Sequence, residues 1–351
     1  MGKDPQAAAR EELLQRRLAQ RQREQSPLSF AQERFWFLDQ LEPGSSEYHI
    51  TVLLSLGGVP DRPKLRGALE HMEVMHPVLR TCYPASRGVP FAKLLEPSGE
   101  SVMTESALAE GESIQQFCRR FHGTTFDLAS GPLWRATLLQ SGPRDYHLVF
   151  CFHHIATDGW SIELLGRDLA SYYNTDQTGT LRDARVAKPS YLELALSQRE
   201  SLVGQRLAEH VDYWVESLAG APSWIELPFD RALPAMVCSQ GAVQRFALPA
   251  SLSRAAEDVA KAIGATPYQL FLSLFAGFLS RISGRDDLVI GTSYAGRDRP
   301  GSGDVAGVFV GTLPLRIPVR SGASLASVFG ETKRVLRDAV AHSELPFEKL
   351  V

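Results

Sequence analysis

The sequence predicts an α+β protein built from two similar lobes. Its length of 351 residues exceeds what one ordinary hydrophobic core accommodates. Segments with strand and helix character are mixed in both halves, and they follow a similar order in each half. A polar, turn-rich stretch at 174–188 separates the halves, and we expect the linker between the lobes there.

The first half begins with residues 1–25, which are rich in helix formers and place leucines on one face. This segment is either a surface helix or a helix that docks a partner. An aromatic, amphipathic helix follows at 28–38. The other elements expected in this half are strands at 48–56, 78–83, 91–95, 133–139 and 146–154, and helices at 63–76, 112–122 and 161–173.

The second half repeats this mixture. Its expected helices lie at 190–199, 206–218, 251–263, 267–281 and 325–342, and its expected strands at 243–246, 288–291 and 308–319. The stretch from Tyr268 to Ile282 is the most apolar, but polar residues interrupt it and it is short for a membrane span, so we expect a core helix. The predicted organisation is a helical leader at 1–25, a first lobe at 26–178 and a second lobe at 179–351.

Composition excludes several classes of function. Hydrophobic residues make up 44% and charged residues 22%, which is typical of globular proteins. The net charge of −3 argues against nucleic acid or an anionic membrane as a partner. The four cysteines show no spacing typical of a zinc site or a disulfide framework. A charged segment follows Met1 where a signal peptide would be apolar, so we expect a cytoplasmic protein.

The most informative run is the sequence from His153 to Gly159, which reads HHIATDG. It follows the apolar stretch LVFCF and precedes a segment with helix-start character. Two histidines therefore lie where a buried strand ends, a common place for functional sites in α/β proteins. Such a pattern is expected by chance on the order of once in a thousand chains of this length.

The two histidines are suited to different tasks. Adjacent strand residues point to opposite faces, so His153 and His154 cannot easily bind one metal ion. The geometry favours one histidine in a site and the other packed behind it. A neutral imidazole, with an ordinary pKa of about 6.5, can accept a proton from an attacking nucleophile at neutral pH. Both could also be structural residues at a strand end, but the full pattern favours function.

Two further residues of the run have expected roles. Asp158 either pairs with a buried arginine and fixes the loop or acts chemically, and the structural role is favoured because buried carboxylates usually form ion pairs. Gly159 leaves space beside the histidine, where a substrate arm could run close to the backbone.

Judged by the run His153–Gly159 and by further motifs, the chain resembles a condensation domain of a non-ribosomal peptide synthetase, within the larger chloramphenicol acetyltransferase-like superfamily. The resemblance covers Leu28 to the end of the sequence. Its motifs occur in the family's order, and the match to the fourth is weak. They are residues 29–36, 76–81, 153–161, 191–200, 305–312 and 345–348.

The resemblance implies two acetyltransferase-like lobes in a V arrangement, with His154 in a tunnel between them. It implies that donor and acceptor peptidyl carrier proteins present their substrates on phosphopantetheine arms, beside a neighbouring adenylation domain. The acceptor amine attacks the donor thioester, giving an amide. No cofactor or metal would be bound by the domain itself. The segments 29–32 and 37–44 resemble domains that join an L-configured donor to an L-configured acceptor.

The resemblance also assigns residue roles. His154 would act on the amine, while His153 and Asp158 would be structural, with Arg80 or Arg297 as the ion-pair partner of Asp158. Either arginine could instead be a solvated surface residue. Further candidates for lining the tunnel or supporting the site are Trp160, Ser161, Gly311 and Thr312.

Two departures from the family pattern leave alternatives open. Gly311 replaces the usual asparagine, and the chain stops at Val351, just after the sixth motif, so we expect an incomplete second lobe. The alternatives are a non-catalytic domain that docks carrier proteins or a tailoring enzyme, and a stand-alone acyltransferase that uses coenzyme A or a carrier. The intact histidine motif favours catalysis.

Overall fold

The computed structural model describes residues 26–97, 103–175, 189–231, 241–320 and 322–350. The predicted leader at 1–25 and most of the predicted linker at 174–188 lie outside these residues. The chain divides into two compact units. The first comprises Met1–Ser201 and Arg297–Val310, and the second comprises Leu202–Gly296 and Gly311–Val351.

This division differs from the sequence-based boundary between residues 178 and 179. Helix α6 (Tyr191–Ser201) and the segment 297–310 both belong to the first unit. The physical reason is burial: Tyr191, Leu194 and Ala195 of α6, together with Val308 of the later segment, are part of the first unit's hydrophobic core. The chain therefore enters the first unit twice.

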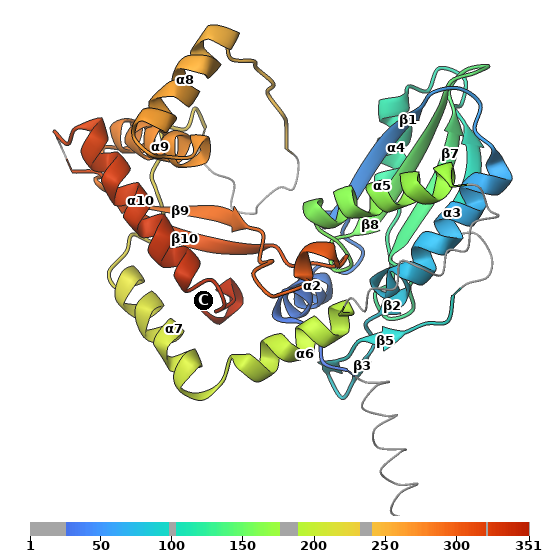
Figure 1. The fold of residues 1–351 in the computed structure, drawn as a ribbon, viewed down its shortest axis with the longest axis horizontal. Coiled ribbons are helices and arrows are strands. Elements are labelled where there is room, and N and C mark those ends of the chain that lie inside the picture. Colours follow the sequence, from blue (N-terminus) through green and yellow to red (C-terminus); the bar gives the residue numbers. More distant parts are fainter. Residues whose placement is uncertain (1–25, 98–102, 176–188, 232–240, 321, 351) are drawn as a thin grey trace, which may run out of the picture. The chain divides into compact units, whose positions relative to one another are not determined.

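A four-stranded sheet forms the centre of the first unit (Figure 1). Its strand order is β1 (His49–Leu56), β8 (Tyr146–His153), β7 (Trp134–Gln140) and β6 (Met103–Ala107). The pairs β1–β8 and β7–β8 are antiparallel, and β6–β7 is parallel. The first unit also contains two short two-stranded sheets. One pairs β2 (Thr81–Cys82) with β5 (Lys93–Leu94), and the other pairs β3 (Ala85–Ser86) with β4 (Val89–Pro90).

Helices cover both faces of this sheet. On one face α3 (Arg62–Met75) packs against α5 (Gly159–Asn174), and the large core contains leucines of both helices together with Leu148 and Phe150 of β8. On the other face, Phe117 of α4 (Ile114–His122) packs with Leu139 and Val149. Because β8 is central and covered on both sides, its sequence is nearly continuously apolar. Helix α2 (Phe30–Leu41) contributes Phe35 to the large core.

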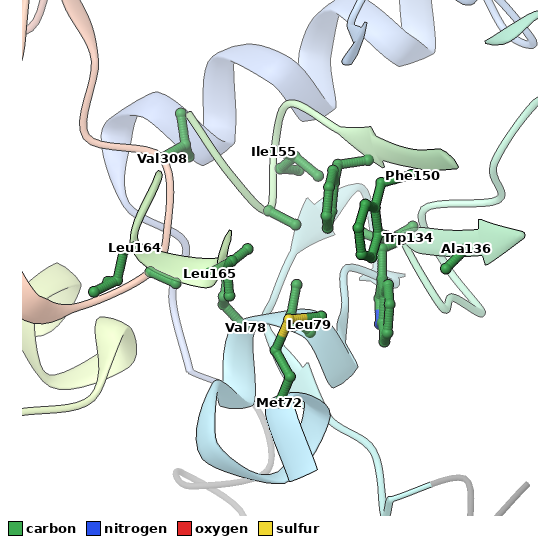
Figure 2. Close-up of a cluster of buried hydrophobic side chains, with 14 of the residues drawn as sticks. Met72, Val78, Leu79, Trp134, Ala136, Phe150, Ile155, Leu164, Leu165 and Val308 are labelled. Carbon is green, nitrogen blue, oxygen red and sulfur yellow. The ribbon is translucent and has the colours of Figure 1, made fainter. Parts of the chain in front are cut away.

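In the large core, aromatic rings stack among aliphatic side chains, as Trp134 and Phe150 do in Figure 2. The ring centroids of Trp134 and Phe152 are 6.2 Å apart, and those of Phe150 and Phe152 are 5.6 Å apart. Burying one such side chain contributes about 1.5–3 kcal/mol. Ile155, two residues beyond the end of β8, is fully buried in the same core, which anchors the loop that follows the strand.

The second unit contains a two-stranded antiparallel sheet of β9 (Asp287–Tyr294) and β10 (Gly311–Pro318). Its helices are α7 (Gly204–Leu218), α8 (Ala250–Ala262), α9 (Pro267–Ser283) and α10 (Leu325–Ala341). Helix α10 packs on both α9 and β10. Arg316 of β10 forms an ion pair with Asp287 of β9, at 2.8 Å.

Several predicted strands are wrong or shorter than expected, and the one at 91–95 is reduced to β5. Residues 243–246 are not in a strand: Val243 and Phe246 are more than 80% exposed, and the segment pairs with no described strand. Residues 78–83 begin in a 3-10 helix, Pro77–Arg80, before β2. Its proline preorganises the φ angle for a helical turn at the position where a strand was expected.

The predicted strand at 308–319 starts only at Gly311. The three preceding residues are held by the first unit, where the Val308 carbonyl accepts a hydrogen bond from the Tyr191 hydroxyl at 2.6 Å. The Phe309 N–H donates to Asp158 at 2.9 Å. Backbone groups engaged in this way cannot take part in the β9–β10 ladder.

Helix α9, expected to be a core helix, is buried on one side only. Leu270, Ala276 and Leu279 are buried, while Phe275 and Phe278 are about half exposed. None of the described helices is by itself long and apolar enough to cross a bilayer, and α8 and α9, which are bent by 101° relative to each other, pass that test only as a pair.

Candidate active site

The histidine motif spans the end of β8, a tight turn and the start of α5. His153 is the last residue of β8 and pairs with His49 of β1. The turn is closed by the N–H of Ala156, which donates to the His153 carbonyl at 3.0 Å. Asp158 then forms the N-cap of α5. The strand, the turn and the helix start thus match the sequence prediction for this region.

His153 is packed inside the unit. It is 3% exposed, and its Nδ1 accepts a hydrogen bond from the Ile155 N–H at 3.1 Å. Its ring contacts the rings of His49 and Phe126. Burial, reinforced by repulsion from His49 and His154, lowers the pKa of His153 to about 3. The imidazole of His153 is therefore neutral at neutral pH and accepts a hydrogen bond from a backbone N–H. This arrangement indicates a structural role.

His154 has different surroundings and is partly exposed. Its ring stacks on Phe35 of α2, with centroids 4.8 Å apart and planes 16° apart. Its backbone N–H donates to the Tyr48 carbonyl at 2.7 Å. Nδ1 is buried and has no hydrogen-bond partner in the described part of the chain. His154 is thus the partly exposed member of the pair of histidines, and His153 the buried one.

Burial is also the main influence on the titration of His154. It lowers the pKa of the imidazole below its ordinary value, and the positive charge of Arg34 acts in the same direction. Backbone groups at His154 and Thr157 and the negative charge of Asp158 act in the opposite direction. The net lowering favours the neutral imidazole, the form that can accept a proton.

Asp158 is held by a buried ion pair with Arg297. The two side chains are each 4% exposed, and Arg297 Nη2 lies 3.0 Å from Asp158 Oδ1. The same oxygen accepts from the Ser161 N–H at 2.8 Å, and Oδ2 accepts from the Phe309 N–H. This carboxylate is fully used in hydrogen bonds, which supports the structural role over the chemical one.

Arg297 extends this network to the segment 302–309. Its Nη1 donates to the carbonyls of Ser302 and Val305 at 2.6 and 2.7 Å, and its guanidinium lies 4.2 Å from the ring centroid of Phe309. Of the two predicted partners of Asp158, Arg297 is the correct one. Arg80 is the last residue of the 3-10 helix and instead donates to the carbonyl of Leu95, the residue after β5, at 2.6 Å.

Ser161 connects the first turn of α5 to Gly307. Its hydroxyl accepts from the Gly307 N–H at 3.0 Å, and its one hydrogen is directed to Asp158 Oδ1 or to the Gly307 carbonyl, each at 2.7 Å. A Cβ atom on Gly307 would lie 1.9 Å from the Tyr191 ring. The glycine is therefore required by the close approach of Tyr191, whose hydroxyl also lies 2.7 Å from Ser29 Oγ.

Gly159 and Trp160 lie on the accessible side of the motif. Gly159 is exposed, and an added Cβ would touch no described atom within 4 Å. Trp160 is 52% exposed, and its indole N–H donates to the Gly303 carbonyl at 3.0 Å. Both border open space, and Trp160 lines an open groove of about 440 Å³ together with Glu163, Leu164, Arg167, Gly303 and Asp304.

Gly311 and Thr312 are the first residues of β10 and belong to the second unit, whereas the other predicted site residues belong to the first. Within β10, Thr312 pairs with Ser293 of β9. Their predicted role beside the histidine stays a prediction.

Two residues near His154 were missed by the sequence analysis. Phe35 and Tyr48 come from α2 and from the residues before β1, and both contact the histidine loop. The sequence signals for Phe35 were the aromatic richness of the helix at 28–38 and the motif at 29–36. No group of three or more His, Cys, Asp or Glu side chains within the described ranges could hold a metal ion.

Comparison with known proteins gives consistent matches. The profile of the family described as "Condensation domain" matches residues 22–351. Phosphinothricin tripeptide synthetase PhsC from Streptomyces viridochromogenes is 41% identical over 331 residues, covering 93% of this chain and 30% of that protein. The chain thus spans less than a third of the length of this curated relative.

Solved structures also match the fold, and two of them serve as examples. The X-domain from teicoplanin biosynthesis matches with a TM-score of 0.83 and 26% identity, covering 93% of this chain and 73% of that one. The first condensation domain of the CDA synthetase matches with a TM-score of 0.76 and 23% identity, covering 93% and 78%. The α+β fold is therefore the acetyltransferase-like fold predicted from the sequence. The V arrangement and the tunnel stay predictions.

Proposed function

Since this chain belongs to the condensation domain family, whose members in peptide synthetases are acyltransferases that form amide bonds, we propose that it joins two carrier-bound substrates. The amine of an acceptor aminoacyl group attacks the carbonyl carbon of a donor acyl or peptidyl thioester. The new C–N bond forms as the C–S bond breaks. The proton lost by the amine goes to the departing thiolate, so that the donor carrier is left with a thiol.

The observation that carries this proposal is the placement of His154. Burial and Arg34 favour its neutral form, and the residue is partly exposed at the end of β8 while its Nδ1 is buried. An α-amino group has an ordinary pKa of about 8, so it loses one proton to become nucleophilic and a second one as the new C–N bond forms. His154 would accept that proton or orient the amine. Much of the rate would come from holding the two reactants together, which replaces a bimolecular step.

The other motif residues would support this geometry. His153, Asp158, Ser161 and Arg297 hold the loop and the segment 302–309 through the contacts described above. Gly159 and Trp160 border the accessible space that a pantetheine arm would need. Gly311 and Thr312 remain candidates for a contribution from the second unit.

The substrates and partners belong to the same proposal. Donor and acceptor peptidyl carrier proteins would present the acyl groups on phosphopantetheine, so the domain would itself bind no cofactor. A neighbouring adenylation domain would load the acceptor carrier. We expect an L-configured donor and acceptor, from the segments at 29–32 and 37–44, and a cytoplasmic location.

The test is a reconstitution with donor and acceptor carrier proteins loaded with simple L-aminoacyl groups. Intact-protein mass spectrometry would follow the dipeptidyl acceptor carrier. We expect product from the parent chain and at least a hundredfold less from His154→Ala. His147→Gln is the matched control, because His147 lies at the opposite end of β8 and bonds to the Ser55 and Ser141 hydroxyls. Equal product from His154→Ala and the parent would contradict the proposed role of the histidine.

A binding role is the second candidate, because one matched structure is the X-domain from teicoplanin biosynthesis and another is the complex of that X-domain with OxyB. The complete histidine motif and its intact hydrogen-bond network favour catalysis. Carrier binding by a parent chain that forms no dipeptide would favour the binding role.

A further inference from the structure

We propose that Phe35 is a positioning residue for His154, and that its ring holds the imidazole in the orientation that directs Nε2 toward the substrate amine. This inference deepens the proposed function and rests on it. The contact joins an α2 side chain to the loop after β8, and neither the motif nor the family match assigns it a role.

The stacking geometry is the first support. The two rings are 4.8 Å apart and only 16° from parallel, and Phe35 is 4% exposed. Tyr48 meets Phe35 edge-on, with centroids 5.3 Å apart and an interplanar angle of 69°. Its carbonyl also accepts the backbone N–H of His154. Phe35 is thus fixed by the residue that fixes the His154 backbone.

The hydrogen bonding of the imidazole is the second support. A histidine ring rotates easily about its terminal torsion, and in functional sites the ring is commonly oriented by a hydrogen bond from one nitrogen. In the described part of this chain, Nδ1 of His154 is buried and meets no hydrogen-bond partner. The flat face of Phe35 therefore adds a restraint on the ring plane to the influence of the backbone groups at His154 and Thr157.

The way in which α2 is anchored is the third support. Ser29 and Gln32 form a capping box at its N-terminus, and Gln32 Nε2 donates to the buried Tyr83 hydroxyl at 2.7 Å. Ser29 Oγ also contacts the Tyr191 hydroxyl. These contacts fix the helix on the first unit, so the position of Phe35 is determined before any substrate binds.

Charged and titratable groups come near the imidazole from several elements. Arg34 comes from α2, His153 from β8 and Asp158 from the N-cap of α5, while Tyr48 contributes the carbonyl that accepts the His154 N–H. Arg34 favours the neutral imidazole and Asp158 the protonated one, while burial lowers its pKa most. Loss of the Phe35 ring would admit water and raise the pKa toward its ordinary value.

The experiment compares Phe35→Leu with Phe37→Leu. Both lie on α2, but Phe37 is 57% exposed, so its variant controls for the loss of an aromatic ring from the helix. Nitrogen-15 NMR of the histidine side chains, without substrates, would give the pKa and tautomer of His154. The same proteins would be assayed for dipeptide formation over a range of pH. Phe35→Tyr, which keeps a flat ring, is the rescuing variant.

We expect Phe35→Leu to lower the rate at least tenfold and to raise the pKa of His154, with Phe37→Leu and Phe35→Tyr close to the parent in both. Parent-like values in Phe35→Leu, or an equal loss in Phe35→Tyr, would overturn the proposal. If Phe35→Leu does not fold, Phe35→Met fills similar space without a flat face and replaces it. Because the NMR titration needs no turnover, it tests the positioning role even if the parent forms no amide.

Discussion

At the scale of single residues, the two histidines of one dipeptide are specialised by their surroundings. His153 lies among His49 and Phe126 with its Nδ1 used by a backbone N–H, and the partly exposed His154 lies against Phe35. His153 is the last residue of β8 and His154 begins the turn that follows, so their side chains have different surroundings. Two adjacent positions thus provide a buried imidazole and a partly exposed one.

The first prediction at this scale concerns acid stability. The pKa of His153 is about 3 in the folded protein and about 6.5 when unfolded, so the unfolded chain binds the extra proton between these values. The stabilisation is complete above the unfolded pKa and is lost as pH falls toward the folded one. His153→Asn keeps an acceptor for the Ile155 N–H but does not titrate.

We therefore expect the loss of unfolding free energy between about pH 6 and pH 4 to be about 2 kcal/mol smaller in His153→Asn than in the parent, by denaturant titration. His49 still titrates in both proteins, so the comparison uses the difference between their slopes of unfolding free energy against pH. Identical pH profiles would show that His153 is charged in the folded state.

At the scale of elements, helix caps allow a matched comparison. Ser29 caps α2 and Ser113 caps α4, and each forms a capping box with a glutamine three residues later. Replacing either serine by alanine removes a side-chain acceptor worth about 1 kcal/mol. Only α2 carries a residue that stacks on His154.

We therefore expect Ser29→Ala to lower the rate of dipeptide formation several-fold, and Ser113→Ala to leave the rate unchanged while causing a similar loss of stability. Thermal unfolding and the carrier-protein assay would measure the two effects. Equal rates in the two variants would show that anchoring of α2 does not affect the site.

The elements also show how far the sequence predicts this structure. The strands at β7 and β8 and the long helices follow from local periodicity and capping, and the motif placed His154 and Asp158 at a strand end. The choice between Arg80 and Arg297 could not be made, because it depends on the tertiary contact of segment 302–309 with α5. The stacking of Phe35 on His154 likewise joins residues far apart in sequence. The exposed segment 243–246 has strand character but lacks a partner strand among the described residues.

At the scale of the whole molecule, the first unit is completed by a distant part of the chain. The segment 297–310 supplies Val305, Ala306 and Val308 to its core and Arg297 to Asp158. We therefore expect the fragment 1–201 to lack cooperative unfolding, and a synthetic peptide of residues 297–310 to restore it. Circular dichroism during heating would measure both.

A peptide carrying Arg297→Met is the control for the ion pair. Leaving Asp158 buried and unpaired costs about 3–5 kcal/mol, so we expect this peptide to bind the fragment at least about a hundredfold more weakly. Cooperative unfolding of the fragment alone, or equal binding of both peptides, would contradict this account.

Because the first unit is formed by two separate parts of the chain, its folding during translation is affected. Asp158 leaves the ribosome long before its partners, since Phe309 follows it by 151 residues and Gly307 follows Ser161 by 146. The first unit therefore cannot reach its final form as soon as residue 201 is made. The loop from His153 to Gly159 can take its final conformation only after most of the second unit has been synthesised. Until then the carboxylate of Asp158, which is buried in the folded protein, stays hydrated.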